Sequence, residues 1–157
     1  MKILLTGANG FIGTHLCNEL SNRNVGFRAT ARNANENNYA DFLSCDLETT
    51  DSLDQLMDGC DIVIHLAGRA HVTSDNSQEK YQVANEFVTQ RLANAAARNG
   101  IARFVYLSSI KVNSESSSPG LPIRQSDTPN PLDNYGRSKL AAELALQEIC
   151  RANNMDY

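Results

Sequence analysis

The feature of this sequence that most constrains its fold is a glycine-rich turn near the N-terminus. An apolar run over residues 2–5 stops at Gly7, and Gly10 and Gly13 follow at intervals of three as a helical pattern begins. Between a strand and a helix, the first glycine of such a turn bends tightly, the second lets a pyrophosphate approach the backbone, and the third packs the helix closely. The helix N-terminus then offers free N–H groups to the phosphates. The turn therefore predicts a dinucleotide-binding site.

The rest of the chain alternates short apolar runs with longer amphipathic stretches. The strands expected after the first cover 27–31, 42–45, 62–66 and 103–107, and the expected helices cover 11–20, 52–57, 79–99 and 135–153. Apolar strands that alternate with helices indicate a parallel sheet covered on both faces. We therefore expect an α/β protein with a doubly wound parallel sheet, the Rossmann fold. Segment 113–134, rich in proline and serine, is expected to be a lid, a binding loop or a surface loop.

Composition and charge limit the classes of protein and partner. With 157 residues, of which 41% are hydrophobic and 20% charged, the chain is long enough for one globular domain. A net charge of −4 without a basic run argues against nucleic acid or a membrane surface as the partner. The four cysteines form no CxxC pair and the three histidines add no ligand spacing, so we expect reduced thiols, no metal and a cytoplasmic location.

A tyrosine and a lysine four residues apart form a candidate acid/base pair. Tyr135 and Lys139 share one face of the last expected helix, where the ammonium would lower the pKa of the phenol. Many such pairs are solvated helix faces, so the weight of this one comes from the preceding strand. That strand ends in Ser108 and Ser109, and the carboxyl ends of parallel strands border the ligand crevice. A serine hydroxyl there could hydrogen-bond the oxygen of a substrate alcohol or ketone.

The glycine turn and the YxxxK motif, in this order, resemble those of the extended short-chain dehydrogenase/reductase superfamily. More narrowly, the chain is similar to the NAD(P)-dependent epimerase/dehydratase family, which acts on nucleotide sugars, and the resemblance covers essentially all 157 residues. It implies that Tyr135 is the acid/base and that Lys139 binds the nicotinamide ribose and tunes the phenol. It also implies that Ser109, with Ser108 as the alternative, binds the substrate oxygen, and that Asn85 supports the active site from below.

The resemblance also implies a set of residues that contact the cofactor. Asp46, followed by Leu47, matches the acidic residue that hydrogen-bonds the adenine amine. The run after the fourth strand matches a segment that lies against the cofactor ribose. The expected cofactor contacts are Gly7, Asn9, Gly10, Phe11, Ile12 and Gly13 in the turn, Arg32, Asp46 and Leu47 after the second and third strands, Leu66, Ala67 and Gly68 after the fourth, and Tyr135 and Lys139.

The end of the second strand bears on the choice of cofactor. A fold that binds NAD usually carries Asp or Glu there, whereas this chain has Ala31, Arg32 and Asn33. Arg32 could instead form a charge-assisted contact with a 2′-phosphate, or it could be a solvated arginine at a strand end. We therefore expect a nicotinamide dinucleotide, NAD(P)(H), and favour NADP(H).

The segment after Ser109 departs from the pattern of many sugar epimerases. Where they have Val-Tyr-Gly, this chain has Val112-Asn113-Ser114, which limits any transfer of substrate specificity. The segment resembles a subgroup associated with sugar nucleotides of bacterial surface polysaccharides. Lys111 and His71 could face an anionic substrate or could be ordinary surface residues.

These observations lead to one functional hypothesis with two alternatives. We expect an NAD(P)-dependent epimerase, dehydratase or reductase of a nucleotide sugar, with a homodimer formed through the two long helices. The alternatives are a reductase of small non-sugar ketones and a non-catalytic dinucleotide-binding module. The family's substrate domain is expected to be missing from these residues, so that 1–157 would be an N-terminal piece that binds cofactor without efficient turnover.

Overall fold

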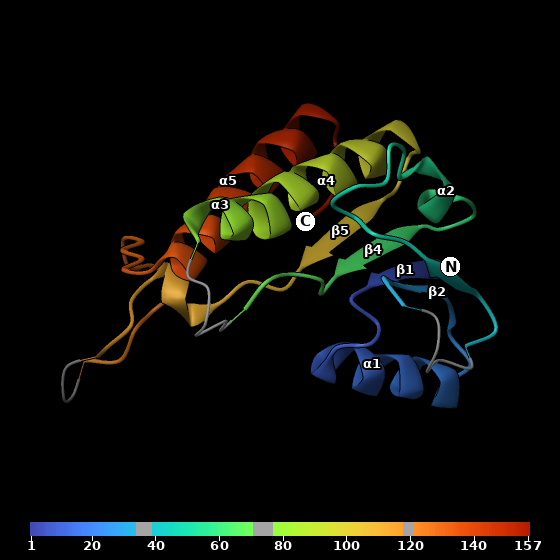
Figure 1. Ribbon diagram of the computed structural model, residues 1–157, viewed down its shortest axis with the longest axis horizontal. Coiled ribbons are helices and arrows are strands. Elements are labelled where there is room, and N and C mark those ends of the chain that lie inside the picture. The colour runs from blue at the N-terminus through green and yellow to red at the C-terminus, as the bar shows by residue number, and fades with distance from the viewer. Residues whose placement is uncertain (34–38, 71–76, 118–120) are drawn as a thin grey trace.

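The chain folds around a five-stranded parallel sheet with the order β3-β2-β1-β4-β5 (Figure 1). The computed structural model describes residues 1–33, 39–70, 77–117 and 121–157. The strands are β1 (Lys2–Thr6), β2 (Gly26–Ala31), β3 (Phe42–Ser44), β4 (Ile62–His65) and β5 (Arg103–Tyr106). The order reverses between β1 and β4, and such a switch point opens a crevice at the carboxyl ends of the strands. The predicted doubly wound parallel fold is confirmed.

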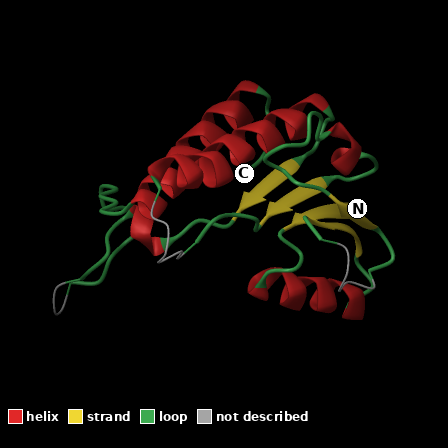
Figure 2. Cartoon of the chain, viewed as in Figure 1, coloured by secondary structure: helices red, strands yellow, loops and turns green. Residues whose placement is uncertain are grey.

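Helices cover both faces of the sheet (Figure 2). They are α1 (Phe11–Asn22), α2 (Asp54–Met57), α3 (Gln78–Tyr81), the π-helical η1 (Gln82–Phe87), α4 (Val88–Arg98), the 3-10 helix η2 (Ile110–Val112) and α5 (Asn134–Ala152). Among the helices of the described residues, α1 lies on one face of the sheet, and α3, α4 and α5 lie on the other (Figure 1). The helix expected over 79–99 is present as three consecutive segments, α3, η1 and α4, of which η1 is π-helical.

Alternation along the central strand β1 divides the core into two layers. Leu4 packs with Leu92 and Phe104 beneath α4 and α5. Its neighbour Leu5 packs with Cys17 of α1 on the opposite face, together with Ala29 of β2. Because successive side chains of a strand point to opposite faces, one apolar run serves both layers. β1 is therefore apolar throughout between Lys2 and Thr6.

Small residues take many of the buried positions on α1 and α5. In α1 the buried residues are Gly13, Cys17 and Leu20, whereas Phe11 and Ile12 of its first turn are exposed. Phe11 is 83% exposed because the glycine at position 13, rather than the bulky residues, packs against the turn. In α5 the buried stripe includes Ala142, Leu146 and Cys150, and Leu144 is exposed.

The remaining boundaries are close to the expected ones. α2 begins at Asp54 rather than at residue 52, after Leu53 and without a side-chain cap. Beyond α5, a parallel bridge joins Asp156 to Arg103 of β5. All four cysteines are free thiols.

In the described part of the chain, no helix is both long and apolar enough to cross a membrane.

Candidate active site

The glycine turn joins β1 to α1 through contacts that exclude side chains. Gly7 has φ +70°, and a Cβ on it would lie 2.7 Å from the backbone nitrogen of Ala67. A Cβ on Gly13 would overlap the carbonyl oxygen of Gly7. The Gly10 N–H donates to that same carbonyl at 2.9 Å and closes the turn. The turn therefore holds α1 and the loop after β4 at backbone contact distance, as a glycine-rich phosphate loop requires.

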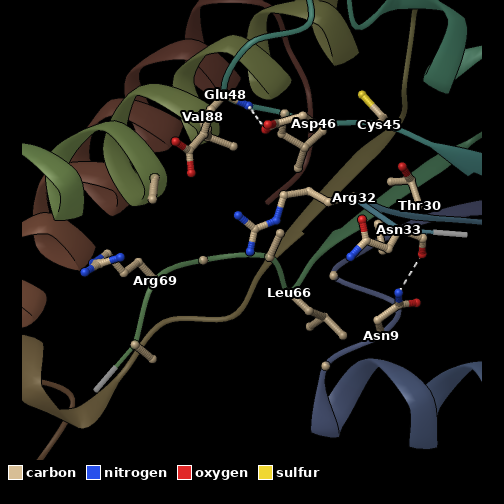
Figure 3. A pocket seen from close by; sticks show the side chains of 18 of the residues that line it. Asn9, Thr30, Arg32, Asn33, Cys45, Asp46, Glu48, Leu66, Arg69 and Val88 are labelled. Carbon is tan, nitrogen blue, oxygen red and sulfur yellow. Dashed lines mark hydrogen bonds between the residues drawn. The ribbon is translucent and has the colours of Figure 1, made fainter. Parts of the chain in front are cut away.

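A cavity of about 790 Å³ opens at the carboxyl ends of β1, β2 and β4 (Figure 3). Its volume is in the range of cofactor and ligand sites. The predicted cofactor contacts that line it are Gly7, Asn9, Gly10, Arg32, Asp46, Leu47, Leu66, Ala67 and Gly68. The other predicted contacts, Phe11, Ile12, Gly13, Tyr135 and Lys139, are not among its lining residues. Ala84 and Val88 of the long helical segment also line it, although no motif indicated them.

Polar side chains gather where β2 and β3 end at this cavity. The Asn9 amide donates to the Asn33 carbonyl at 2.8 Å, and the Asp46 carboxylate accepts the Glu48 N–H at 3.0 Å. Figure 3 shows the Arg32 side chain extending among the residues that line the cavity. The arrangement provides a cation and a carboxylate at the end where an adenosine would be expected.

Lys139 is buried at the end of β5. Its ammonium donates to the Leu107 carbonyl at 2.6 Å and lies 4.0 Å from the centre of the Tyr106 ring. Burial lowers its pKa from 10.5 to about 8, opposed by the negative charge of Glu143. Tyr135 lies one turn earlier on α5, its ring centre 6.1 Å from that of Tyr81. A buried ammonium one helical turn from a tyrosine is suited to stabilising a phenolate.

The two candidate serines are placed differently. Ser109 is the N-cap of η2, and its hydroxyl accepts the Lys111 N–H at 3.3 Å. Ser108 has a buried hydroxyl without a hydrogen-bond partner in the described structure. Ser108 lines a small cavity with Phe104 and Leu146, on the α5 side of the sheet. The two serines therefore face different environments, and only Ser109 takes part in capping the segment that precedes α5.

Asn85 ties the loop after β4 to α5. Its side-chain oxygen accepts the Arg69 N–H at 2.7 Å, and its amide donates to the Arg69 carbonyl at 3.0 Å and to the Ser138 hydroxyl at 2.9 Å. A Cβ on Gly68 would lie 2.8 Å from the same side-chain oxygen. Asn85 lies within η1, and π-helical turns inside α-helices are frequent at functional sites. Asn85 therefore touches both the cavity wall and the helix that carries Tyr135.

A buried chain of hydrogen bonds, not predicted from the sequence, runs beneath these groups. The Thr89 hydroxyl donates to the Asn85 carbonyl at 2.6 Å and contacts His65 Nε2 at 3.2 Å. The Thr6 hydroxyl contacts His65 Nδ1 at 2.7 Å and accepts the Ala67 N–H at 3.3 Å. Each hydroxyl has one proton, so we assign the proton of the neutral imidazole to Nε2, where it is donated to Thr89.

Burial keeps this imidazole neutral. His65 is fully buried, and burial, with a smaller effect of the Lys139 charge, lowers its pKa to about 3. From the sequence alone, a histidine at the end of a buried strand is compatible with a side chain that only fills space in the core. Only the positions of Thr6 and Thr89 make it a link between the glycine turn and η1.

Lys111 is held by carboxylates of its own chain. Its ammonium lies 2.6 Å from Asp133 and 3.6 Å from Glu115. The hydrogen bond with Asp133 raises the pKa of Lys111. For Asp133, burial alone would raise the pKa, but the Gly136 N–H and Lys111 together bring it below the usual value. His71, the other residue considered for an anionic substrate, lies outside the described residues.

The sheet order, the glycine turn and the cavity at the switch point define a dinucleotide-binding α/β protein. Residues 3–157 match the model of the NAD dependent epimerase/dehydratase family. The chain belongs to this family. The described residues contain no group of three or more histidine, cysteine or acidic side chains that could hold a metal ion.

Among curated proteins, the chain is similar to sugar-nucleotide epimerases. It is 33% identical over 160 residues to UDP-glucose 4-epimerase of Vibrio cholerae, covering 99% of this chain and 49% of that protein. It is 30% identical over 171 residues to GDP-mannose 3,5-epimerase of Arabidopsis thaliana, covering 100% of this chain and 44% of that protein. The chain therefore spans about half the length of these relatives.

The chain also matches about half the length of several solved structures. MoeE5 in complex with UDP-glucose and NAD superposes with a TM-score of 0.87 at 31% identity, covering 99% of this chain and 51% of that one. UDP-glucuronic acid 4-epimerase from Bacillus cereus, in complex with UDP-glucuronic acid and NAD, superposes with a TM-score of 0.84 at 28% identity, covering 99% and 54%. Both complexes contain NAD, so they lend no support to the preference for NADP(H) expected from Arg32.

Proposed function

We propose that this chain carries the cofactor half and the acid/base residues of an epimerase, dehydratase or reductase of a nucleoside-diphosphate sugar. The observation that carries the proposal is the buried ammonium of Lys139, fixed at the end of β5 one helical turn from Tyr135. Burying a cation costs free energy of folding, and buried charged groups with a shifted pKa are concentrated at functional sites. Family membership and the sugar-nucleotide relatives support the substrate class.

In this proposal each residue has a defined task. Lys139 stabilises Tyr135 as the phenolate, which accepts the hydroxyl proton of the sugar and becomes a neutral phenol as the carbinol is oxidised to a ketone. Ser109 donates a hydrogen bond to the same substrate oxygen, and Asn85 holds the surrounding loop and helix. A bound nicotinamide supplies the hydride acceptor and donor. Return of the hydride to the opposite face of the ketone gives an epimerase, and elimination of water gives a dehydratase. Net transfer of the hydride to the substrate gives a reductase, and all three reactions use these residues.

The test of the acid/base assignment is Tyr135→Phe in the protein that carries this sequence. We expect loss of turnover, because the proton acceptor is removed, with the affinity for reduced nicotinamide cofactor largely unchanged. Turnover is followed by nicotinamide absorbance with UDP-glucose and UDP-glucuronic acid, and affinity by fluorescence titration. Retained turnover would refute the assignment. Activity confined to non-sugar ketones would favour the small-ketone reductase instead.

For the cofactor, we propose that Arg32 makes NADP(H) the preferred form. Arg32 lines the cavity at the end of β2, where the sequence has no acidic residue to hydrogen-bond an adenosine ribose. We expect Arg32→Ala to weaken NADPH binding by about tenfold, the usual scale for one charge-assisted contact, and to leave NADH affinity nearly unchanged. Dissociation constants of both cofactors are measured for both proteins. Equal affinities in the wild type would contradict the preference.

Two further expectations belong to the same proposal. We propose a homodimer through α4 and α5, supported by the exposed apolar side chain of Leu144 on α5. A cytoplasmic location, associated with polysaccharide biosynthesis, remains a prediction from the free thiols and the sequence resemblance.

A further inference from the structure

Lys111 is bonded in two directions at once. Its backbone N–H donates to the Ser109 hydroxyl at 3.3 Å, and its ammonium donates to one carboxylate oxygen of Asp133 at 2.6 Å. The other carboxylate oxygen of Asp133 accepts the Gly136 N–H at 2.6 Å and caps α5. Three consecutive hydrogen bonds therefore lead from Ser109 to the first turn of α5, which contains Tyr135.

The backbones on the two sides of this path are also in close contact. A Cβ on Gly136 would lie 2.6 Å from the Lys111 carbonyl oxygen and 3.0 Å from the Pro131 side chain. The glycine lets the start of α5 approach η2 at backbone distance. The Asn130 N–H adds a bond to the Val112 carbonyl at 3.1 Å, between the same two segments. Close packing and hydrogen bonds thus act on one junction.

We propose that the Lys111–Asp133 ion pair is a positioning device that holds the Ser109 segment against the start of α5 and so sets the placement of Ser109 relative to Tyr135. The inference rests on the proposed roles of these two residues. It assigns Lys111 a task inside the protein rather than at an anionic substrate. The pair is only partly exposed, with side-chain exposures of 26% for Lys111 and 32% for Asp133, which limits its screening by salt.

The first test measures the junction itself by hydrogen exchange of backbone amides. In Lys111→Met, amides of 109–112 and of 135–137 should exchange together about two- to fivefold faster, the scale of one partly exposed ion pair. Asp133→Asn should have the same effect, because an asparagine still caps the helix but lacks the charge. Lys111→Arg should restore slow exchange. Faster exchange at 109–112 alone, or unchanged exchange, would overturn the inference.

The second test separates positioning from substrate binding by kinetics. With a nucleotide sugar, Lys111→Met and Asp133→Asn should each lower kcat about fivefold or more with little change in KM, because a misplaced catalytic group slows chemistry. The double variant should be no slower than either single variant. A raised KM in Lys111→Met alone, absent from Asp133→Asn, would instead make Lys111 a substrate contact.

A matched control is available away from the site. Lys2 pairs with Asp41 at 2.7 Å, and both side chains are 31% exposed, so Lys2→Met removes a similar ion pair without touching η2 or α5. It should leave kcat and exchange at 109–112 and 135–137 unchanged. If Tyr135→Phe retains turnover, the proposed chemistry fails, yet the exchange experiment still decides whether the pair couples the two segments.

Discussion

At the scale of single residues, the site depends on groups whose chemistry is set by burial and close contact. Lys139 is 5% exposed, although many YxxxK pairs lie on solvated helix faces. The sequence predicts that Tyr135 and Lys139 share a helix face, because spacing alone determines this. The depth of Lys139 and its bond to the Leu107 carbonyl depend on where α5 packs against β5, and no local pattern contains that information.

The lowered pKa of Lys139 predicts how stability varies with pH. Its pKa falls from 10.5 to about 8 on folding, so above pH 8 the unfolded chain binds more protons than the folded one, and stability rises with pH. Relative to Lys139→Met, the free energy of unfolding of the wild type should increase by about 1.5 kcal/mol between pH 8 and 9.5. Urea unfolding of both proteins at these pH values measures it. Parallel curves would show that Lys139 is not desolvated.

At the scale of elements, the divided helix is the main addition to the expected fold. The sequence predicts one helix over 79–99 and assigns Asn85 to it from family resemblance. The Asn85 carbonyl, within the π-helical segment η1, accepts a hydrogen bond from the Thr89 hydroxyl, which also contacts His65. Helical periodicity does not reveal a one-turn irregularity, since its apolar pattern differs little from that of an α-helix. The connection between η1 and the glycine turn through His65 therefore emerges only in three dimensions.

This connection predicts a cost for removing the Thr89 hydroxyl. Thr89→Val keeps the shape but leaves the His65 Nε2–H and the Asn85 carbonyl without this partner, and should lower the free energy of unfolding by about 2–3 kcal/mol. Thr89→Ser keeps the hydroxyl and loses one methyl group, at a cost of about 1 kcal/mol. Urea unfolding compares the three proteins. A valine variant as stable as the serine variant would argue against the assigned chain of bonds.

At the scale of the whole molecule, the sheet order brings separate motifs to one edge. The glycine turn, Arg32, Asp46 and Leu66 follow β1, β2, β3 and β4, and all four line the same cavity. In the relatives, the matched part is about half of the protein.

This division predicts separable properties for the chain on its own. We expect residues 1–157 to bind reduced nicotinamide cofactor, because the cavity is formed by described residues of the chain itself. We expect no efficient turnover of UDP-glucose or UDP-glucuronic acid. Fluorescence titration measures the first property and product analysis the second. Efficient turnover would contradict this expectation, as would a lack of cofactor binding by a folded chain.

Local apolar periodicity and the steric demands at Gly7, Gly10 and Gly13 were sufficient to predict the strands, the positions of the main helices, the parallel sheet and the glycine turn. The sequence also identified Asn9, Arg32 and Asp46 among the polar residues that line the cavity, since parallel strands carry their carboxyl ends to one edge. Which polar side chains are buried and which are paired became known only from the tertiary structure. The desolvation of Lys139 and His65 and the bond between Lys111 and Asp133 arise from packing between segments far apart in the chain, which local sequence does not specify.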